Sequence, residues 1–229
     1  MKARIFFVTG TDTEVGKTYV TALLAEKGRQ AGLRVGAYKP VCSGAVTRED
    51  GSRYWEDVER LRASIGRTVS AERICPQCFA APLAPPVAAR LEGKAVNSDL
   101  LTTGLDWWRD RFDVVLVEGA GGLLSPVTDC WLVADLVQQL GRPPLIVVAR
   151  NGLGTINHTL LTLEVAAHRG LPVRAVVLSD VSGQGSDQSK RSNAQEIAKR
   201  ISCPLFVLPH QSTEILSLNG HPRTLDLIT

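Results

Sequence analysis

The apolar residues of the chain fall into six short, nearly continuous runs, separated by segments in which apolar residues recur every three or four positions. Continuous apolar character is typical of strands that are covered on both faces, whereas the longer spacing is typical of amphipathic helices. The pattern therefore predicts an α/β fold with a mostly parallel central sheet and helices on both faces. The predicted strands are 4–10, 35–41, 113–121, 144–150, 173–180 and 203–209.

Helical spacing predicts a helix between each pair of neighbouring strands, and two before the third strand. The predicted helices are 17–31, 54–65, 98–110, 131–140, 155–169 and 187–201. Gly32 and Gly170 stand where two of these helices would have their C-terminal caps. The proline-rich segment 68–97 is predicted to be irregular. A length of 229 residues with 44% hydrophobic content suits one buried core, so we expect a single domain over 1–229.

Polar and glycine-rich segments follow each predicted strand. Because parallel strands place their carboxyl ends at one edge of a sheet, where ligands bind, we expect these segments to meet in one site. They are the glycine loop after the first strand and the segments 39–44, 118–122, 150–158, 179–183 and 209–212.

The glycine loop reads TGTDTEVGKTYV at 9–20, between a predicted strand and a predicted helix. Such a loop aims several backbone N–H groups at one point, and Lys17 and Thr18 add a cation and a hydroxyl suited to Mg²⁺. Gly10 and Gly16 are separated by five residues, whereas the strict phosphate-loop pattern has four. The loop is therefore interpreted as a variant phosphate-binding loop, with a plain glycine turn as the alternative.

Three charged residues could complete a phosphate site. Lys39 ends an otherwise apolar strand, where a cation needs an anionic partner, although a surface lysine is the alternative. Glu118 ends another apolar strand, the position expected of a carboxylate that reaches Mg²⁺, with a turn or capping role as the alternative. Asp57 could be a second metal carboxylate, but the spacing alone leaves its role open.

Composition and charge exclude several classes of function. A net charge of +3 with scattered basic residues and 5% aromatics predicts no nucleic-acid surface. No apolar run approaches roughly 18 residues and the start of the chain does not look like a signal peptide, so we expect no membrane contact and a cytoplasmic location. Five cysteines suggest reduced thiols, and Cys75 and Cys78 are interpreted as structural rather than metal-binding.

No nucleophile and base stand at recognisable spacing, so the chemistry predicted is positioning and electrostatic stabilisation of phosphoryl transfer.

Four motifs, GTDTEVGKT, YKPVCSG, VEGAGG and GLGTINH, in this order and at these distances, resemble the dethiobiotin synthetase family over about residues 4 to 183. The resemblance implies a P-loop NTPase-like fold and a homodimer with substrate at the subunit interface. It also implies ATP and Mg²⁺ as cofactors, and 7,8-diaminopelargonic acid and CO₂ as substrates. The diamine would take up CO₂ as a carbamate, ATP would phosphorylate it, and the second amine would displace phosphate to close a cyclic urea.

The resemblance also implies site residues. Those implied to be catalytic are Lys17, Lys39 and Thr13. Those implied to hold Mg²⁺ are Thr18, Asp57 and Glu118. Those implied to bind nucleotide are Asp12, Glu14, Val15, Gly16, Lys17, Thr18, Tyr19, Glu118, Ser179 and Pro209. Those implied to bind the diamine or its carbamate are Thr13, Lys39, Ser43, Gly121, Gly154 and Asn157, the last two presented by the neighbouring subunit to the substrate carboxylate.

The chain departs from the family pattern at three places. Ser179 stands where some members have an adenine-reading asparagine, Pro86 stands where histidine is usual, and the tyrosine that touches the substrate carboxylate has no counterpart. We therefore expect weaker base selectivity and a different carboxylate site. Two other classes of protein are alternatives. A partition-type switch ATPase shares the fold and the loop but would carry a lysine at Asp12. A cobyrinate-type synthetase activates carboxylates similarly but would carry a glutaminase domain, for which this length leaves no room.

Overall fold

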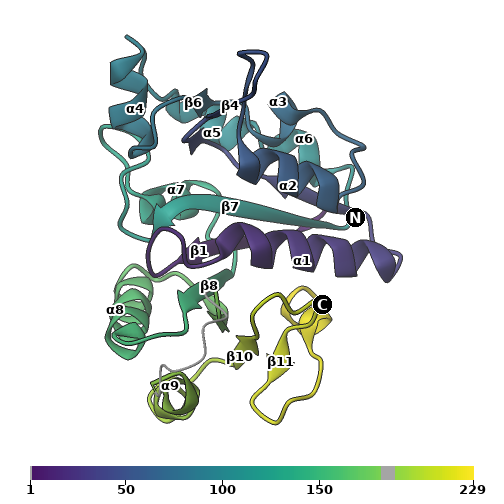
Figure 1. Cartoon of the computed structure of the whole chain (residues 1–229), viewed down its shortest axis with the longest axis vertical. Helices are drawn as coiled ribbons and strands as arrows, with labels where there is room; N and C mark the ends of the chain where they lie inside the picture. The colour runs from purple at the N-terminus through teal and green to yellow at the C-terminus, as the bar shows by residue number, and fades with distance from the viewer. Residues whose placement is uncertain (1, 182–188) are drawn as a thin grey trace.

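The computed structural model describes residues 2–181 and 189–229 and has a seven-stranded sheet in the order β11-β10-β9-β8-β1-β7-β2 within that part of the chain (Figure 1). Neighbouring strands pair parallel except β10 with β11, which are antiparallel. The strands are β1 Arg4–Gly10, β2 Val35–Tyr38, β7 Val114–Gly122, β8 Leu145–Arg150, β9 Val173–Ser179, β10 Leu205–Leu208 and β11 Leu216–Ser217. The predicted parallel sheet is confirmed, and β11 is an addition at its edge.

Five of the predicted helices are present, each a little shorter than expected. They are α1 Lys17–Gln30, α2 Glu56–Ser64, α7 Val133–Gln139, α8 Thr155–His168 and α9 Ser189–Ala198. The start predicted for the last helix, at 187, and the last two residues of the predicted site segment 179–183 lie outside the described residues. A 3-10 helix, η1 Thr224–Leu227, follows β11 and was not predicted.

The single helix predicted over 98–110 is wrong, because the structure has two helices there, α5 Ser98–Thr103 and α6 Asp106–Arg109. The break lies beside the ring of Tyr38, whose hydroxyl donates to the Leu100 carbonyl at 2.8 Å. A Cβ at Gly104 would lie 2.2 Å from that hydroxyl. The tyrosine therefore occupies the space that an unbroken helix with side chains would need.

The segment 68–97, predicted to be irregular, contains two short helices and a short strand, α3 Ala71–Ile74, α4 Pro85–Leu91 and β6 Cys78–Phe79. Strand β6 pairs with β3 Cys42–Ser43, and nearby β4 Val46–Thr47 pairs with β5 Arg53–Tyr54. The predicted strand 35–41 stops at Tyr38 because the Lys39 N–H leaves the sheet and donates to the Ile74 carbonyl at 2.8 Å. The segment forms a small layer beside the β2 edge of the main sheet (Figure 1).

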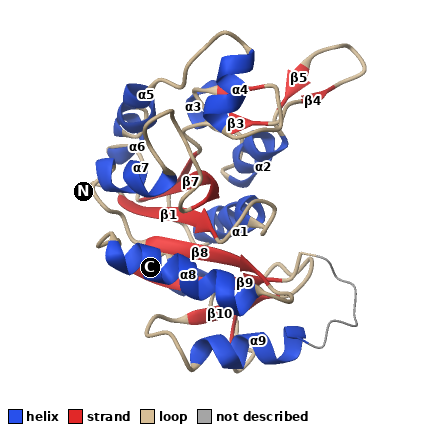
Figure 2. Ribbon diagram, turned by 90° about the vertical axis from the view of Figure 1, so that its left-hand side faces the viewer, coloured by secondary structure: helices blue, strands red, loops and turns tan. Residues whose placement is uncertain are grey.

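Helices cover both faces of the main sheet, as predicted. Helix α1 packs on β1, β2 and β7, whereas α7 packs on β7 and α8 on β8. Figure 2 shows α1 and α2 on one side of β1 and β7, and α7 on the other. Right-handed crossovers require this arrangement, because the chain moves from β1 toward one edge through α1 and from β7 toward the other edge through α7.

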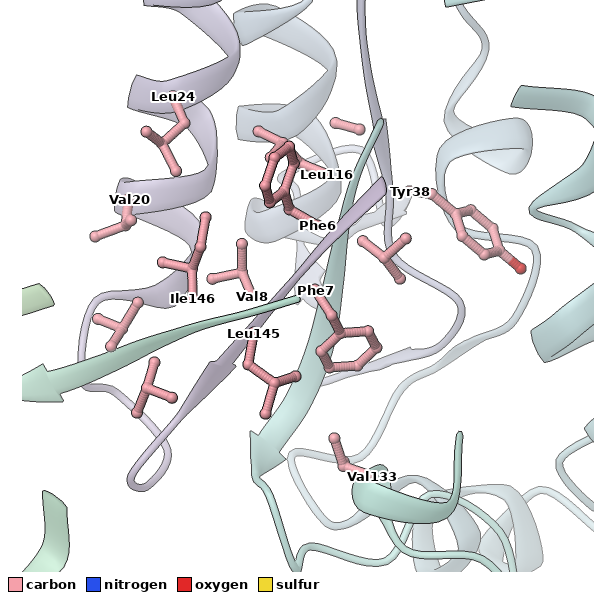
Figure 3. Packing of buried hydrophobic residues seen from close by; sticks show 14 of the residues in the cluster. Phe6, Phe7, Val8, Val20, Leu24, Tyr38, Leu116, Val133, Leu145 and Ile146 are labelled. Carbon is pink, nitrogen blue, oxygen red and sulfur yellow. The ribbon is translucent and has the colours of Figure 1, made fainter. Parts of the chain in front are cut away.

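Apolar side chains from the strands and helices form one buried cluster (Figure 3). Val8 from β1 and Ile146 from β8 lie near Val20 and Leu24 of α1, whereas Phe7 points toward the side of the sheet where Val133 of α7 lies. All six side chains are fully buried. This continuous core supports the prediction of a single domain over 1–229, which stays a prediction. Within the described residues, no helix combines the length and apolar character that crossing a membrane requires.

We predict that Leu24→Ala lowers the free energy of unfolding by roughly 2–5 kcal/mol, because it removes a fully buried side chain and leaves a cavity between α1 and the sheet. Chemical denaturation followed by circular dichroism measures the loss. Leu91→Ala is the matched control, since Leu91 at the end of α4 is 68% exposed and its loss should change stability little. Equal destabilisation by the two variants would contradict this account of the core.

Candidate functional site

The glycine loop connects β1 to α1 and closes over itself. Gly16 is the N-cap of α1 and has φ of +96°, a conformation that is strained for residues with a side chain. A Cβ at this position would also lie 2.8 Å from Ser179 Oγ. A Cβ at Gly10 would lie 2.7 Å from the Asp12 carbonyl oxygen. Lys17 Nζ donates to that same carbonyl at 2.8 Å, across the loop. Both glycines are thus required for the loop to close, and Lys17 is held in its centre.

The middle of the loop is shaped by its own side chains. Asp12 Oδ1 accepts from the Thr13 N–H at 2.7 Å and from the Thr13 hydroxyl at 3.2 Å. Glu14 has φ of +56°, and Val15 is buried beneath the loop. The carboxylate at position 12 therefore organises the turn, at the place where a partition-type ATPase would have its lysine.

Four side chains from four elements form one hydrogen-bonded network at the carboxyl edge of the sheet. Thr18 Oγ1 at the start of α1 lies 2.8 Å from Asp57 Oδ1 of α2 and 2.8 Å from Glu118 Oε1 of β7. Lys39 Nζ, just after β2, donates to Asp57 Oδ2 at 2.7 Å and to Glu118 Oε1 at 2.6 Å. The structure thus brings the three predicted metal residues together with Lys39, one of the two lysines predicted to be catalytic. Their roles stay predictions.

Burial sets the electrostatics of this network. Burial alone would lower the pKa of Lys39, but Glu118 and Asp57 raise it well above its ordinary value. Burial works against ionisation of Asp57, but the contacts with Lys39 and Thr18 outweigh it and lower the pKa of Asp57. Lys39 is therefore a fixed cation and Asp57 a fixed anion.

Lys17 behaves differently from Lys39 because no carboxylate of the described residues contacts its ammonium. Burial lowers its pKa to about 8; Glu118 opposes this shift and the ammonium of Lys39 adds to it. Its Nζ contact is a backbone carbonyl, which is a weaker partner for a charge than a carboxylate. An anion bound in the loop would supply the missing counter-charge.

The oxygen atoms of the network suit Mg²⁺. This ion takes oxygen ligands, and at phosphate sites it is bound by one or two carboxylates together with phosphates and water. Asp57 Oδ1 and Glu118 Oε1 both lie within hydrogen-bond distance of Thr18 Oγ1. Glu118 Oε2 is buried and has no hydrogen-bond partner among the described residues, so it keeps an unused lone pair inside the site. The donor set therefore fits the predicted metal.

The predicted substrate residues are distributed around the loop. Gly121 has φ of +73°. A Cβ added to it would lie 2.4 Å from Ser125 Oγ and 3.9 Å from the methyl group of Thr13. Ser43, at the end of β3, donates to the Leu83 carbonyl at 2.6 Å. Gly154 is the N-cap of α8 and Asn157 lies in its first turn, both exposed. Gly121 and Thr13 are therefore neighbours, whereas Ser43 and the start of α8 belong to separate elements.

Two hollows of about 440 and 430 Å³ open in front of the loop. Thr11, Asp12 and His158 line both of them. The larger hollow continues between the segment after β7 and the exposed face of α8, and the smaller one reaches Arg150 at the end of β8. Neither Arg150 nor His158 is among the site residues predicted from the sequence. For His158, the available signal was its place in the first turn of a helix that starts at the site edge.

On the other side of the loop, Tyr19 of α1 donates its hydroxyl to the Ser212 carbonyl at 3.0 Å and so joins α1 to the segment 209–212 that begins with Pro209. Ser179, at the end of β9, is 4% exposed and its hydroxyl packs against Gly16. This hydroxyl therefore supports the loop, and weaker base selectivity stays a prediction.

The chain matches known proteins over most of its length. A family model described as an AAA domain matches residues 4–212. The ATP-dependent dethiobiotin synthetase BioD of Rhodopirellula baltica is 42% identical over 96% of this chain and 90% of that protein. The proteins of the same name from Anaeromyxobacter dehalogenans (strain 2CP-C) and Bacillus subtilis (strain 168) are 47% and 38% identical, over 90% and 89% of this chain and 90% and 85% of those proteins. The chain belongs to the ATP-dependent dethiobiotin synthetase family. Membership confirms the predicted resemblance and decides against the partition-type and cobyrinate-type alternatives.

Solved structures of two other proteins have a fold similar to that of this dethiobiotin synthetase family member. The signal recognition particle receptor FtsY from Elizabethkingia anophelis superposes with a TM-score of 0.53 at 16% identity, over 99% of this chain and 65% of that chain. Chloroplast FtsY from Physcomitrella patens gives the same TM-score, identity and coverage. At this identity the likeness shows the fold alone, and it confirms the predicted fold class.

We predict that the protein takes up close to one proton when ATP with Mg²⁺ binds at pH 8.5 to 9. Lys17, with a pKa of about 8, is then largely neutral in the free protein, and phosphate beside it raises that pKa and draws a proton in. At pH 7 the lysine is already charged, so this uptake disappears. Calorimetric titration in buffers of different ionisation enthalpy measures the number of protons.

The matched control for this measurement is Lys17→Arg, whose guanidinium stays charged over the whole range. Proton release from ATP itself is common to both proteins and cancels in the comparison. Identical proton uptake by wild type and Lys17→Arg at the higher pH would show that a group other than Lys17 takes the proton.

Proposed function

We propose that this chain catalyses the ATP-dependent conversion of 7,8-diaminopelargonic acid and CO₂ to dethiobiotin, ADP and phosphate. The observation that carries the proposal is the network of Thr18, Lys39, Asp57 and Glu118 directly beside a phosphate-type loop. A reaction that passes through a carbamate and a phosphorylated carbamate adds negative charge at each stage. Buried cations and a metal site next to the loop are what such a sequence of anions requires.

In the proposed mechanism the loop and Lys17 bind the phosphates of ATP. Thr18, Asp57 and Glu118 hold Mg²⁺, which when bound supplies charge neutralisation on the transferred phosphoryl group. Asp12 keeps the turn of the loop in place through the Thr13 N–H, so that the backbone donors stay aimed at the phosphates. These roles rest on the geometry described above and on membership of the family.

Lys39 and Thr13 act on the substrate side. One amine of the diamine attacks CO₂ and loses a proton to give the carbamate, whose oxygen then attacks the terminal phosphorus of ATP and releases ADP. The second amine attacks the carbonyl carbon and expels phosphate, which closes the ring. We assign Lys39 to the carbamate and the migrating phosphoryl group, because its compact ammonium is already fixed at the network by two acids.

We further propose that the functional unit is a homodimer in which α8 of one subunit serves the substrate of the other. Leu153, directly before the helix, is 90% exposed, and Leu161 on the same helix is 57% exposed. Exposed apolar side chains beside a helix N-terminus suit a subunit contact that also presents N–H groups to a carboxylate. Gly154 and Asn157 would supply this end of the site. The cytoplasmic location expected from the sequence stays a prediction.

We expect the purified protein to release ADP and form dethiobiotin only when ATP, Mg²⁺, the diamine and bicarbonate are all present, with little ADP release without the diamine. Lys17→Ala should lower the rate roughly 100-fold or more, because the loss of one positioned donor to a developing charge typically costs that much. Lys94→Ala, a lysine with an exposed side chain outside the site, is the control and should retain the rate of wild type. Mass spectrometry of the product and a coupled ADP assay measure both.

ATP hydrolysis that ignores the diamine would point to a free-running ATPase and reject the proposed ligase. A folded Lys17→Ala variant with most of the wild-type activity would reject the role of the loop instead. Circular dichroism of each variant separates these results from simple unfolding.

The shared site can be tested by mixing two inactive variants. If Asn157 serves the partner's substrate and Lys17 its own subunit's nucleotide, a mixed dimer of Lys17→Ala with an inactive Asn157 variant has one site with both lesions and one with neither. We expect recovery of up to half the wild-type activity per mixed dimer. Mixing Lys17→Ala with Lys39→Ala is the control and should give no recovery. Each substitution then lies in the site of its own chain, so each of the two sites in the mixed dimer carries one lesion. No recovery in the first mixture, with subunit exchange demonstrated, would mean that each site is built within one chain.

A further inference from the structure

A second group of chemically reactive side chains lies next to Lys39 and takes no part in the proposed mechanism. Cys42 of β3 and Cys78 of β6 are register partners in the small parallel sheet, and Cys75 stands three residues before Cys78, directly after α3. Strand β3 pairs with β6, and Figure 2 shows β3 beside α2 and α3. Three of the five cysteines of the chain are therefore gathered in one place.

The three thiols differ in access and acidity. Cys42 and Cys75 are buried, whereas Cys78 is partly exposed. The Cys78 thiol donates to the Cys75 carbonyl at 3.7 Å, and the Cys75 thiol donates to the Gln77 carbonyl at 3.4 Å. The neighbouring Cys75 side chain lowers the pKa of Cys78, and burial foremost raises that of Cys75. Burial also raises the pKa of Cys42 to about 12. Cys78 is thus both the accessible and the most readily ionised thiol of the group, and Cys75 is in contact with it.

The geometry of the group does not suit a metal. Within residues 2–181 and 189–229, no three His, Cys, Asp or Glu side chains are placed so that they could hold a metal ion together. A Cys-x-x-C pair without a second ligand pair has redox chemistry as its main alternative. The remaining chemistry of Cys75 and Cys78 is therefore that of a dithiol.

The dithiol segment is hydrogen-bonded to the elements that carry two of the network side chains. The Lys39 N–H donates to the Ile74 carbonyl at 2.8 Å, and the Cys42 N–H donates to the Gln77 carbonyl at 2.9 Å. On its other side, the indole of Trp55 donates to the Phe79 carbonyl at 2.9 Å. Trp55 is the N-cap of α2, two residues before Asp57. A shift of the segment 74–79 would therefore reach both the ammonium of Lys39 and the carboxylate of Asp57.

We propose that Cys75 and Cys78 form a reversible disulfide with small-molecule disulfides as oxidants, and that this disulfide inactivates the site by displacing Lys39 and Asp57. The site of modification is Cys78, and Cys75 is the resolving thiol. The effect on activity rests on the proposed function, whereas formation of the disulfide does not.

The chemistry balances without any further reactant. The Cys78 thiolate attacks one sulfur of the oxidant, which forms a mixed disulfide and releases one thiolate of the oxidant. Cys75 then loses its proton and attacks Cys78 Sγ, which releases the second thiolate and leaves the Cys75–Cys78 bond. The protein loses two protons and two electrons, and the oxidant takes them up and becomes two thiols.

Closing the bond changes the contacts of the segment between the two cysteines. It removes both thiol donors, and with them the contacts to the Gln77 and Cys75 carbonyls, and it holds the sulfur atoms about 2.05 Å apart with a restricted dihedral angle. Cys78 is anchored in β6 and Cys75 follows directly on α3, so the segment between them adjusts. A displacement of about 1 Å in a positioned catalytic group can cost on the order of 100-fold in rate. We therefore expect at least a tenfold fall in turnover on oxidation.

The test uses the full chain with Cys130→Ser and Cys203→Ser, so that only the grouped cysteines remain. This protein is incubated with oxidised glutathione, the excess is removed, and peptides are mapped by mass spectrometry beside an assay of dethiobiotin formation. We expect a Cys75–Cys78 crosslink, at least a tenfold loss of turnover, and recovery of both with dithiothreitol. Adding Cys75→Ser or Cys78→Ser should leave the reduced activity unchanged and abolish the reversible loss, whereas adding Cys42→Ser should leave the loss intact.

Three results would overturn the proposal. They are a Cys42–Cys78 crosslink instead, a glutathione adduct on Cys78 that Cys75 never resolves, and a complete Cys75–Cys78 crosslink with full turnover. Should one serine variant fold poorly, the other and the crosslink map still decide. A reduced protein that makes no dethiobiotin would reject the proposed function, and the crosslink map is then scored by itself, so the two failures remain distinguishable.

Discussion

The ion pair between Lys39 and Glu118 is the interaction on which the site depends. The side chain of Glu118 is fully buried and that of Lys39 is 4% exposed, with 2.6 Å between Nζ and Oε1. Removing two charges from water costs several kcal/mol per ion, and only a close partner with further hydrogen bonds offsets that cost. Thr18 and Asp57 provide those bonds, so the four side chains stabilise one another and none is well placed without the others.

The register between β2 and β7 places Lys39 next to Glu118. Tyr38 of β2 is the partner of Val117 of β7, so the residues that follow them, Lys39 and Glu118, leave the two strands side by side. On its other side Glu118 is the partner of Val8, two residues before Gly10, which places the glycine loop against it. Because β7 lies between β1 and β2, three segments distant in sequence place the glycine loop, Glu118 and Lys39 side by side.

This register explains which parts of the site can be read from the sequence. Lys39, Glu118 and the loop each follow an apolar strand, and the edge rule for parallel sheets brings them together. Asp57 could not be assigned in this way, because its place depends on how α2 packs on α1, which no local pattern encodes.

The misread parts of the fold have equally local causes. The segment 68–97 contains a strand of two residues, which is too short to show a periodic pattern. Proline at the start of α4 is equally compatible with a loop, so the sequence does not distinguish the two. The break between α5 and α6 is set by a tyrosine more than sixty residues away in sequence. Strong periodic elements were therefore predictable, whereas features decided by tertiary contacts were not.

The charges of the site determine what it can accept. Lys17 and Lys39 contribute two positive charges and Asp57 and Glu118 two negative ones, so the cluster is neutral with all four ionised. A divalent cation on the acidic oxygens would leave an excess of positive charge, and burial makes such an excess costly. A polyphosphate is the class of ligand that removes it, and the burial that lowers the pKa of Lys17 to about 8 favours a counter-anion in the loop. Metal and nucleotide should therefore bind better together than either binds alone, because each supplies the charge that the other one requires.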